Sequence, residues 1–85
     1  MTLFNYISTN IDRVKAEVKA GIIPCSMLSH WEIYSRFDVY KKMGYNTVLS
    51  VFYVSEEKRI TEDAMYKIKR KMETEIHESV NNKLQ

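Results

Sequence analysis

Apolar side chains return at intervals of three and four residues along most of this chain, a period typical of α-helices with one buried face. Three residues interrupt this periodicity and mark the ends or starts of helices. Gly21 and Gly44 suit the left-handed conformation that ends a helix, and Pro24 suits the first turn of a new one. No stretch alternates convincingly between apolar and polar residues, so a single strand would have no partner. These features predict an all-α fold.

We expect one small four-helix domain spanning residues 1–85. A chain of 85 residues buries a limited core, and an apolar fraction of 45% is typical of a folded chain. The periodicity predicts helices near residues 10–20, 25–43, 47–57 and 61–80, followed by a frayed tail at 81–85. In the second helix, a series of aromatic residues at helical spacing is expected to fill the core rather than to stack on bases: Trp31, Tyr34, Phe37 and Tyr40.

The sequence of the segment from Val48 to Val54 is compatible with either a helix or a strand. It is rich in β-branched and aromatic residues, which favour a strand. Val48, Val51, Phe52 and Ser55 nevertheless fit one face of a helix, and no second strand is available to pair with this one. We therefore favour a helix here.

Several classes of function find little support in the sequence. Cys25 is the sole cysteine, so no intrachain disulfide can form, and neither His30 nor His77 has the spacing of a zinc site. Cys25 could be a nucleophile beside His30, but a lone cysteine is more often a packing residue. No glycine-rich loop is present to cradle a phosphate. We expect no catalysis, cofactor, metal or small-molecule substrate.

The expected location is the cytoplasm. A single cysteine suits a reducing compartment. The first ten residues lack the basic and apolar regions of a signal peptide, and the longest apolar run, Val51 to Val54, is too short to cross a membrane.

The most fully specified helix begins at Thr61, whose hydroxyl can cap its first turn. Glu62 and Asp63 follow, where the helix dipole favours negative charge. Met65, Ile68 and Met72 form an apolar stripe, and Ile76 and Val80 could prolong it. Between Glu57 and Met72 there are six basic and three acidic residues, so this segment carries +3 in a chain whose net charge is +2.

The third and fourth helices can together form a helix-turn-helix, in which the second helix enters the DNA major groove. Ser55 would be the small residue where the helices cross, and Ile60 the apolar residue before the cap. The candidate DNA-binding residues are Thr61, Glu62, Tyr66, Lys67, Arg70 and Lys71.

The candidate residues have different chemistry. Lys67, Arg70 and Lys71 could neutralise phosphates, and Tyr66 or Lys67 could reach base edges. Glu62 could accept a hydrogen bond from cytosine, although capping and dipole roles are the commoner reason for acids at this position.

The stretch Ile60 to Met72 resembles the second half of the helix-turn-helix in many bacterial regulators. With Ile23-Pro24-Cys25-Ser26 opening an aromatic helix ahead of it, the arrangement is similar to small helix-turn-helix proteins of bacterial mobile elements. Two positions depart from the family pattern. Arg59 stands where the turn commonly has glycine, and Lys58 stands where an apolar residue is usual, so we expect a longer turn.

The resemblance implies a non-enzymatic protein that binds double-stranded DNA, as a transcriptional regulator or a mobile-element accessory factor. A homodimer is expected, because two copies present recognition helices to successive major grooves. The alternative is a small helical interaction or assembly module without nucleic-acid binding. Core filling is the expected role of the methionines, but several could instead line a partner surface: Met27, Met43, Met65 and Met72, with Ile76.

Overall fold

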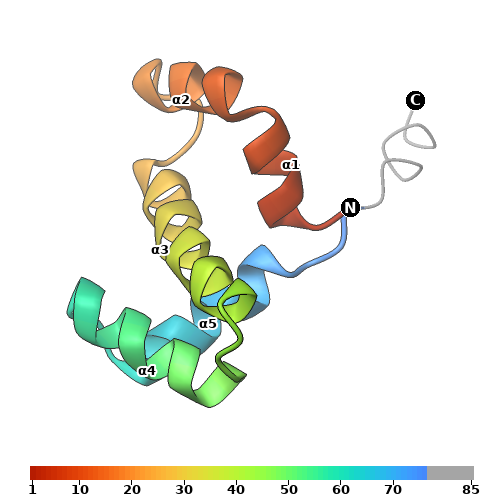
Figure 1. Cartoon of the computed structure of the whole chain (residues 1–85). Helices are drawn as coiled ribbons and strands as arrows, with labels where there is room; N and C mark the ends of the chain where they lie inside the picture. The colour runs from red at the N-terminus through yellow and green to blue at the C-terminus, as the bar shows by residue number, and fades with distance from the viewer. Residues whose placement is uncertain (77–85) are drawn as a thin grey trace.

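The computed structural model describes residues 1–76, and this part of the chain is all-helical (Figure 1). Five helices follow one another: α1 Leu3–Thr9, α2 Ile11–Lys19, α3 Cys25–Lys42, α4 Thr47–Lys58 and α5 Glu62–Met72. Within residues 1–76 the β-type pairing is limited to an isolated antiparallel bridge between Thr2 and Glu75. The predicted all-α class is confirmed.

The middle helices begin and end where the sequence indicated. Gly21 and Gly44 have φ angles of 81° and 101°, the left-handed backbone expected just beyond α2 and α3. The ambiguous segment from Val48 to Val54 lies within α4, which begins after Asn46. The Asn46 side chain accepts a hydrogen bond from the backbone N–H of Leu49 at 2.8 Å.

The prediction of four helices is wrong at the N-terminal end, where α1 is an additional helix. The Thr2 hydroxyl caps it by accepting from the backbone N–H of Asn5. With seven residues, α1 is too short to show a clear period, and isolated helices of this length are unstable. Its stability comes from packing, because Ile7 is buried and the Trp31 indole N–H of α3 donates to the Ser8 hydroxyl at 2.9 Å.

The prediction of a last helix reaching residue 80 is also wrong, since α5 ends at Met72. The backbone beyond it pairs with the N-terminal segment. The N–H of Leu3 donates to the carbonyl of Thr74, and the N–H of Ile76 donates to the carbonyl of Met1, both at 2.8 Å. The Thr74 carbonyl and the Ile76 N–H, which a longer α5 would use for its own hydrogen bonds, are therefore bonded to the N-terminal segment instead. The predicted helix from 77 to 80 and the tail 81–85 lie outside the described residues.

The core lies where α3, α4 and α5 pack against one another, and α1 and α2 cover the first turns of α3 (Figure 1). Phe37 is buried, and Trp31, Tyr34 and Tyr40 are partly buried against the core, as the aromatic spacing predicted. The fully buried side chains include Met65 and Met72, so these two methionines fill the core as expected and do not line a partner surface. The core members are Ile7, Val14, Phe37, Val51, Val54, Met65, Ile68 and Met72.

The predicted inward face of α4 is only half correct. Val51 and Ser55 are buried, together with Ser50 and Val54, but Val48 and Phe52 are exposed. The four inward residues occupy positions i, i+1, i+4 and i+5 of one helical face. Because α4 is apolar on both sides, its sequence alone does not distinguish the inward side from the outward one.

The connection from α4 to α5 is a three-residue turn, Arg59 to Thr61, within the usual length for a helix-turn-helix motif. The expected longer turn is therefore wrong. Arg59 takes the left-handed conformation, with φ 56° and ψ 46°, and the N–H groups of Arg59 and Ile60 both donate to the carbonyl of Ser55. The Thr61 hydroxyl then accepts from the N–H of Ala64 at 3.0 Å, which caps α5 as predicted.

The left-handed backbone at Arg59 leads to a stability prediction. Replacing Arg59 with glycine should raise the free energy of unfolding by about 1 kcal/mol, because glycine lacks the Cβ that crowds this conformation. Urea unfolding followed by circular dichroism measures the change. Arg59→Ala is the matched control, since it removes the same charge but keeps the Cβ, and it should give no gain. A loss of stability in Arg59→Gly would contradict the turn geometry.

Candidate nucleic-acid interface

The outward face of α5 follows from its buried face. Met65, Ile68 and Met72 point into the core, and Met65 and Met72 have no exposed surface. With 3.6 residues per turn, Asp63, Lys67 and Arg70 lie on the opposite side, and all three are exposed. The candidate interface is therefore a basic face of α5 that projects away from the core.

The six candidate DNA-binding residues lie on one helix but not on one face. Thr61, Glu62, Lys67, Arg70 and Lys71 are exposed, whereas Tyr66 is half-buried and packs against the core. Lys67 and Arg70 lie opposite the buried stripe. Lys71 lies on the flank near α3 and lines a cavity there. The structure thus exposes three basic side chains on two sides of α5, and Tyr66 is less accessible than any of them.

Two of the basic side chains of α5 form ion pairs with carboxylates of the same chain. Lys67 lies 3.3 Å from the Asp63 carboxylate, one turn earlier, and both side chains are largely exposed. Such a pair contributes little stability, on the order of 0.3–0.5 kcal/mol, so Lys67 can exchange it for another anion. Lys69 pairs with Glu73 at 3.0 Å. Among residues 1–76, no ion-pair partner is found for Arg70 or Lys71.

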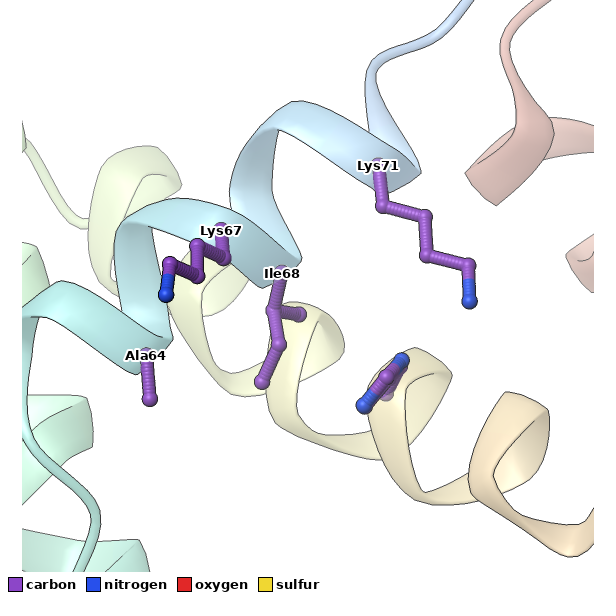
Figure 2. Close-up of a pocket in the computed structure, with 5 residues that line it drawn as sticks. Ala64, Lys67, Ile68 and Lys71 are labelled. Atoms are coloured by element: carbon purple, nitrogen blue, oxygen red, sulfur yellow. The ribbon is translucent and has the colours of Figure 1, made fainter.

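A cavity of about 290 Å³ opens between α5 and α3, lined by His30, Ala64, Lys67, Ile68 and Lys71. Figure 2 shows Ala64 and Ile68 pointing toward α3, while the Lys67 side chain turns back along α5 and the Lys71 ammonium group lies on the other side of Ile68. The cavity therefore has an apolar lining, with the ammonium group of Lys71 near its edge and that of Lys67 paired to Asp63. This arrangement can hold an anionic oxygen, such as that of a phosphate.

His30 is the residue of this cavity that the sequence did not assign to the interface. Its Nδ1 atom is buried and has no hydrogen-bond partner among the described residues. Burial in the first place, and the nearby charge of Lys71 in the second, lower the pKa of His30 below its ordinary value. An anion in the cavity would reverse the second effect. No spacing in the sequence connects His30 with Lys71, because their proximity depends on how α3 packs on α5.

The structure also bears on three other features considered from the sequence: a metal site, a reactive cysteine and a membrane-spanning helix. Within residues 1–76, no group of three or more His, Cys, Asp or Glu residues is placed to hold a metal ion. Cys25 is exposed at the start of α3 and is not a buried packing residue. None of the five described helices combines the length and the apolar character needed to cross a membrane.

Comparisons with models of known protein families, with curated proteins and with solved structures found no match to this chain. The assignment of a function therefore depends on the residues and geometry described above.

The position of Lys71 leads to a prediction about His30. Replacing Lys71 with methionine should raise the pKa of His30, because it removes a positive charge that opposes protonation. The pKa should remain below the ordinary value, since burial is the larger cause. NMR titration of the His30 ring protons measures it. Arg70→Met removes an equal charge from the outward face and should leave this pKa unchanged, and an equal shift in both variants would contradict the geometry.

The lowered pKa of His30 also predicts a pH dependence of stability. The unfolded chain takes up a proton on this residue near pH 6.5, whereas the folded chain does so only at lower pH. The free energy of unfolding should therefore fall as the pH drops below about 6.5, until the folded pKa is passed. Urea unfolding at a series of pH values tests this. The decline between about pH 6.5 and 5 should be shallower in His30→Gln, and an unchanged slope would count against the effect.

Proposed function

We propose that this chain is a non-enzymatic protein that binds double-stranded DNA, with α4 and α5 forming a helix-turn-helix and α5 entering the major groove. One observation carries the proposal: Arg59 has a left-handed backbone at the turn position where the resembling family has glycine. A residue with a Cβ rarely adopts this conformation unless the surrounding structure requires it. The turn geometry thus supports the motif despite the departure in sequence.

The residues around the turn support the same proposal. Ser55 is buried near the end of α4, and its small side chain would allow α4 and α5 to approach closely. Ile60, just before the cap, packs against the core. The burial of Ser55 and the partial burial of Ile60 support the proposed roles, because a helix crossing needs a small residue and the turn needs an apolar anchor.

The exposed basic residues of α5 would make the DNA contacts. Lys67 and Arg70 lie opposite the buried stripe, so they would reach farthest into the groove and contact base edges or phosphates. Lys71 and the cavity beside His30 would receive a backbone phosphate on the flank of the helix. Thr61 and Glu62 lie at the N-terminus of α5, where Thr61 already serves as the cap. Tyr66 would contribute only through the edge that remains exposed.

The biological role follows from the resemblance to small helix-turn-helix proteins of bacterial mobile elements. We propose a cytoplasmic transcriptional regulator or a mobile-element accessory factor that acts as a homodimer. A dimer suits this mode of binding, because two recognition helices about 34 Å apart read successive major grooves.

The alternative function is a helical assembly module that binds other proteins and not DNA. One observation favours it, namely the apolar side chains that α4 exposes, among them Val48, Leu49 and Phe52. The two functions differ in whether the basic face of α5 has a ligand, and DNA titration distinguishes them.

The decisive test is binding to duplex DNA of random sequence, measured by fluorescence anisotropy over a range of salt concentrations. The affinity should fall steeply as salt rises, because phosphate contacts release counterions. The double variant Lys67→Ala/Arg70→Ala should bind at least about tenfold more weakly and with a smaller salt dependence.

The chain offers a matched control in Lys15→Ala/Lys19→Ala. These two residues are exposed on α2, at the end of the molecule away from α4, and their removal changes the net charge equally (Figure 1). This control should retain most of the affinity. A wild-type chain that fails to bind DNA even at low salt would contradict the proposal, and equal losses in both double variants would move the site away from α5.

A further inference from the structure

The cavity between α3 and α5 is large enough for a small organic molecule. Its volume is about 290 Å³, and its lining comes from His30 on α3 and from four residues of α5. An apolar cavity of about 150 Å³ can hold a benzene molecule, so this one has room for a single ring with a short substituent. The size of the cavity therefore suits a ligand of roughly this class.

Most of the cavity lining is apolar. Ile68 is only 7% exposed, and Ala64 is half-buried one turn before it. Figure 2 shows both side chains pointing toward α3. The methylene stems of Lys67 and Lys71 add apolar surface, as the stems of lysines commonly do. A hydrated inorganic ion would cover this surface poorly, whereas the apolar body of an organic ligand would remove it from water.

A positive charge lies at the other end of the cavity. In Figure 2 the Lys71 ammonium group and Ala64 lie on opposite sides of Ile68. The ammonium group of Lys67 is paired with the Asp63 carboxylate at 3.3 Å, whereas no ion-pair partner is found for Lys71 within residues 1–76. Among the described residues that line the cavity, Lys71 therefore supplies the unpaired positive charge.

His30 adds a second polar group near that charge. Its Nδ1 atom is buried with no hydrogen-bond partner among residues 1–76, so Nε2 is the ring nitrogen that a ligand in the cavity can reach. A ring proton on Nε2 avoids a buried N–H without an acceptor and makes Nε2 a hydrogen-bond donor. Burial, and after it the charge of Lys71, lowers the pKa of His30, so the ring is neutral near pH 7 and close enough to Lys71 to interact. No carboxylate is among the described residues that line the cavity.

These features favour a ligand with one negative charge and an apolar body. One ammonium group and one neutral imidazole match a monoanion, whereas a dianion would leave a charge uncompensated in a partly buried site. A ring is preferred to a flexible chain of equal size, because it has fewer rotatable bonds to immobilise. We propose that the cavity between α3 and α5 binds a small aromatic carboxylate, with the carboxylate between Lys71 and His30 and the ring over Ile68 and Ala64.

This proposal goes beyond DNA binding and does not depend on it, because the carboxylate can be titrated into the chain without DNA. The two functions share one residue. Lys71 is also a proposed phosphate contact, so a bound carboxylate would occupy the charge that Lys71 offers to DNA. The ligand is therefore expected to compete with one backbone phosphate and to leave Arg70 free to bind DNA.

NMR titration of the full chain with benzoate at about pH 7.5, where His30 is neutral, tests the proposal. The methyl signals of Ile68 and the ring signals of His30 should shift and saturate together, with a Kd on the order of 1 mM. Benzamide keeps the ring without the charge, and inorganic phosphate keeps the charge without the ring, so each should bind at least about tenfold more weakly. The absence of a saturable shift with benzoate would overturn the proposal. Equal affinity for benzamide would remove the role of the charge, and equal affinity for phosphate would remove the role of the ring, so either result would also overturn it.

Three variants locate the ligand within the cavity. Lys71→Met removes the ammonium group but keeps an apolar side chain, and it should weaken benzoate binding about tenfold while leaving benzamide binding unchanged. Arg70→Met is the matched control, because it removes an equal charge from the outward face of α5, and it should bind benzoate like the wild-type chain. Ala64→Leu fills the apolar end of the cavity and should block both ligands, with the helical content by circular dichroism unchanged. Equal losses in Lys71→Met and Arg70→Met, or full binding by a folded Ala64→Leu chain, would place the ligand elsewhere and contradict the proposal.

Discussion

The packing of the apolar stripe of α5 against α3 and α4 is the contact on which the rest of the structure depends. Met65 and Met72 are completely buried, and each such side chain contributes roughly 1.5–3 kcal/mol when it leaves water. This burial fixes the rotation of α5, so Lys67 and Arg70 must project outward. It also brings the end of α5 close to the N-terminal segment, where backbone hydrogen bonds join residues 1–3 with residues 74–76.

Because the turn between α4 and α5 is short, the fixed rotation of α5 also fixes the orientation of α4. Arg59 accepts a left-handed backbone because Ser55 and Ile60 are both held by the core on either side of it. The resulting crossing buries Val51 and Val54 and turns Val48 and Phe52 to the outside. One short turn therefore sets which surfaces are exposed, namely the basic face of α5 and the apolar side of α4 that carries Val48 and Phe52. Since they lie on different helices, variants of one surface should leave the other intact.

The candidate site could be predicted in part from the sequence. The exposure of Lys67, Arg70 and Lys71 followed from the period of Met65 and Ile68, because that period is a local property of one helix. Two features escaped prediction. Tyr66 is half-buried, since its flank of α5 lies against the rest of the core, and His30 lies beside the Lys71 flank because α3 crosses α5 there. Both features depend on packing between helices.

The sequence by itself determined the all-α class and most helix limits, because Gly21, Gly44, Asn46 and Thr61 act on the backbone within one turn. Tertiary structure alone decided the existence of α1, the end of α5 at Met72 and the outward side of α4. Each of these outcomes depends on contacts between residues far apart in the chain. Local periodicity describes which residues share a face of a helix, but only packing selects the face that is buried.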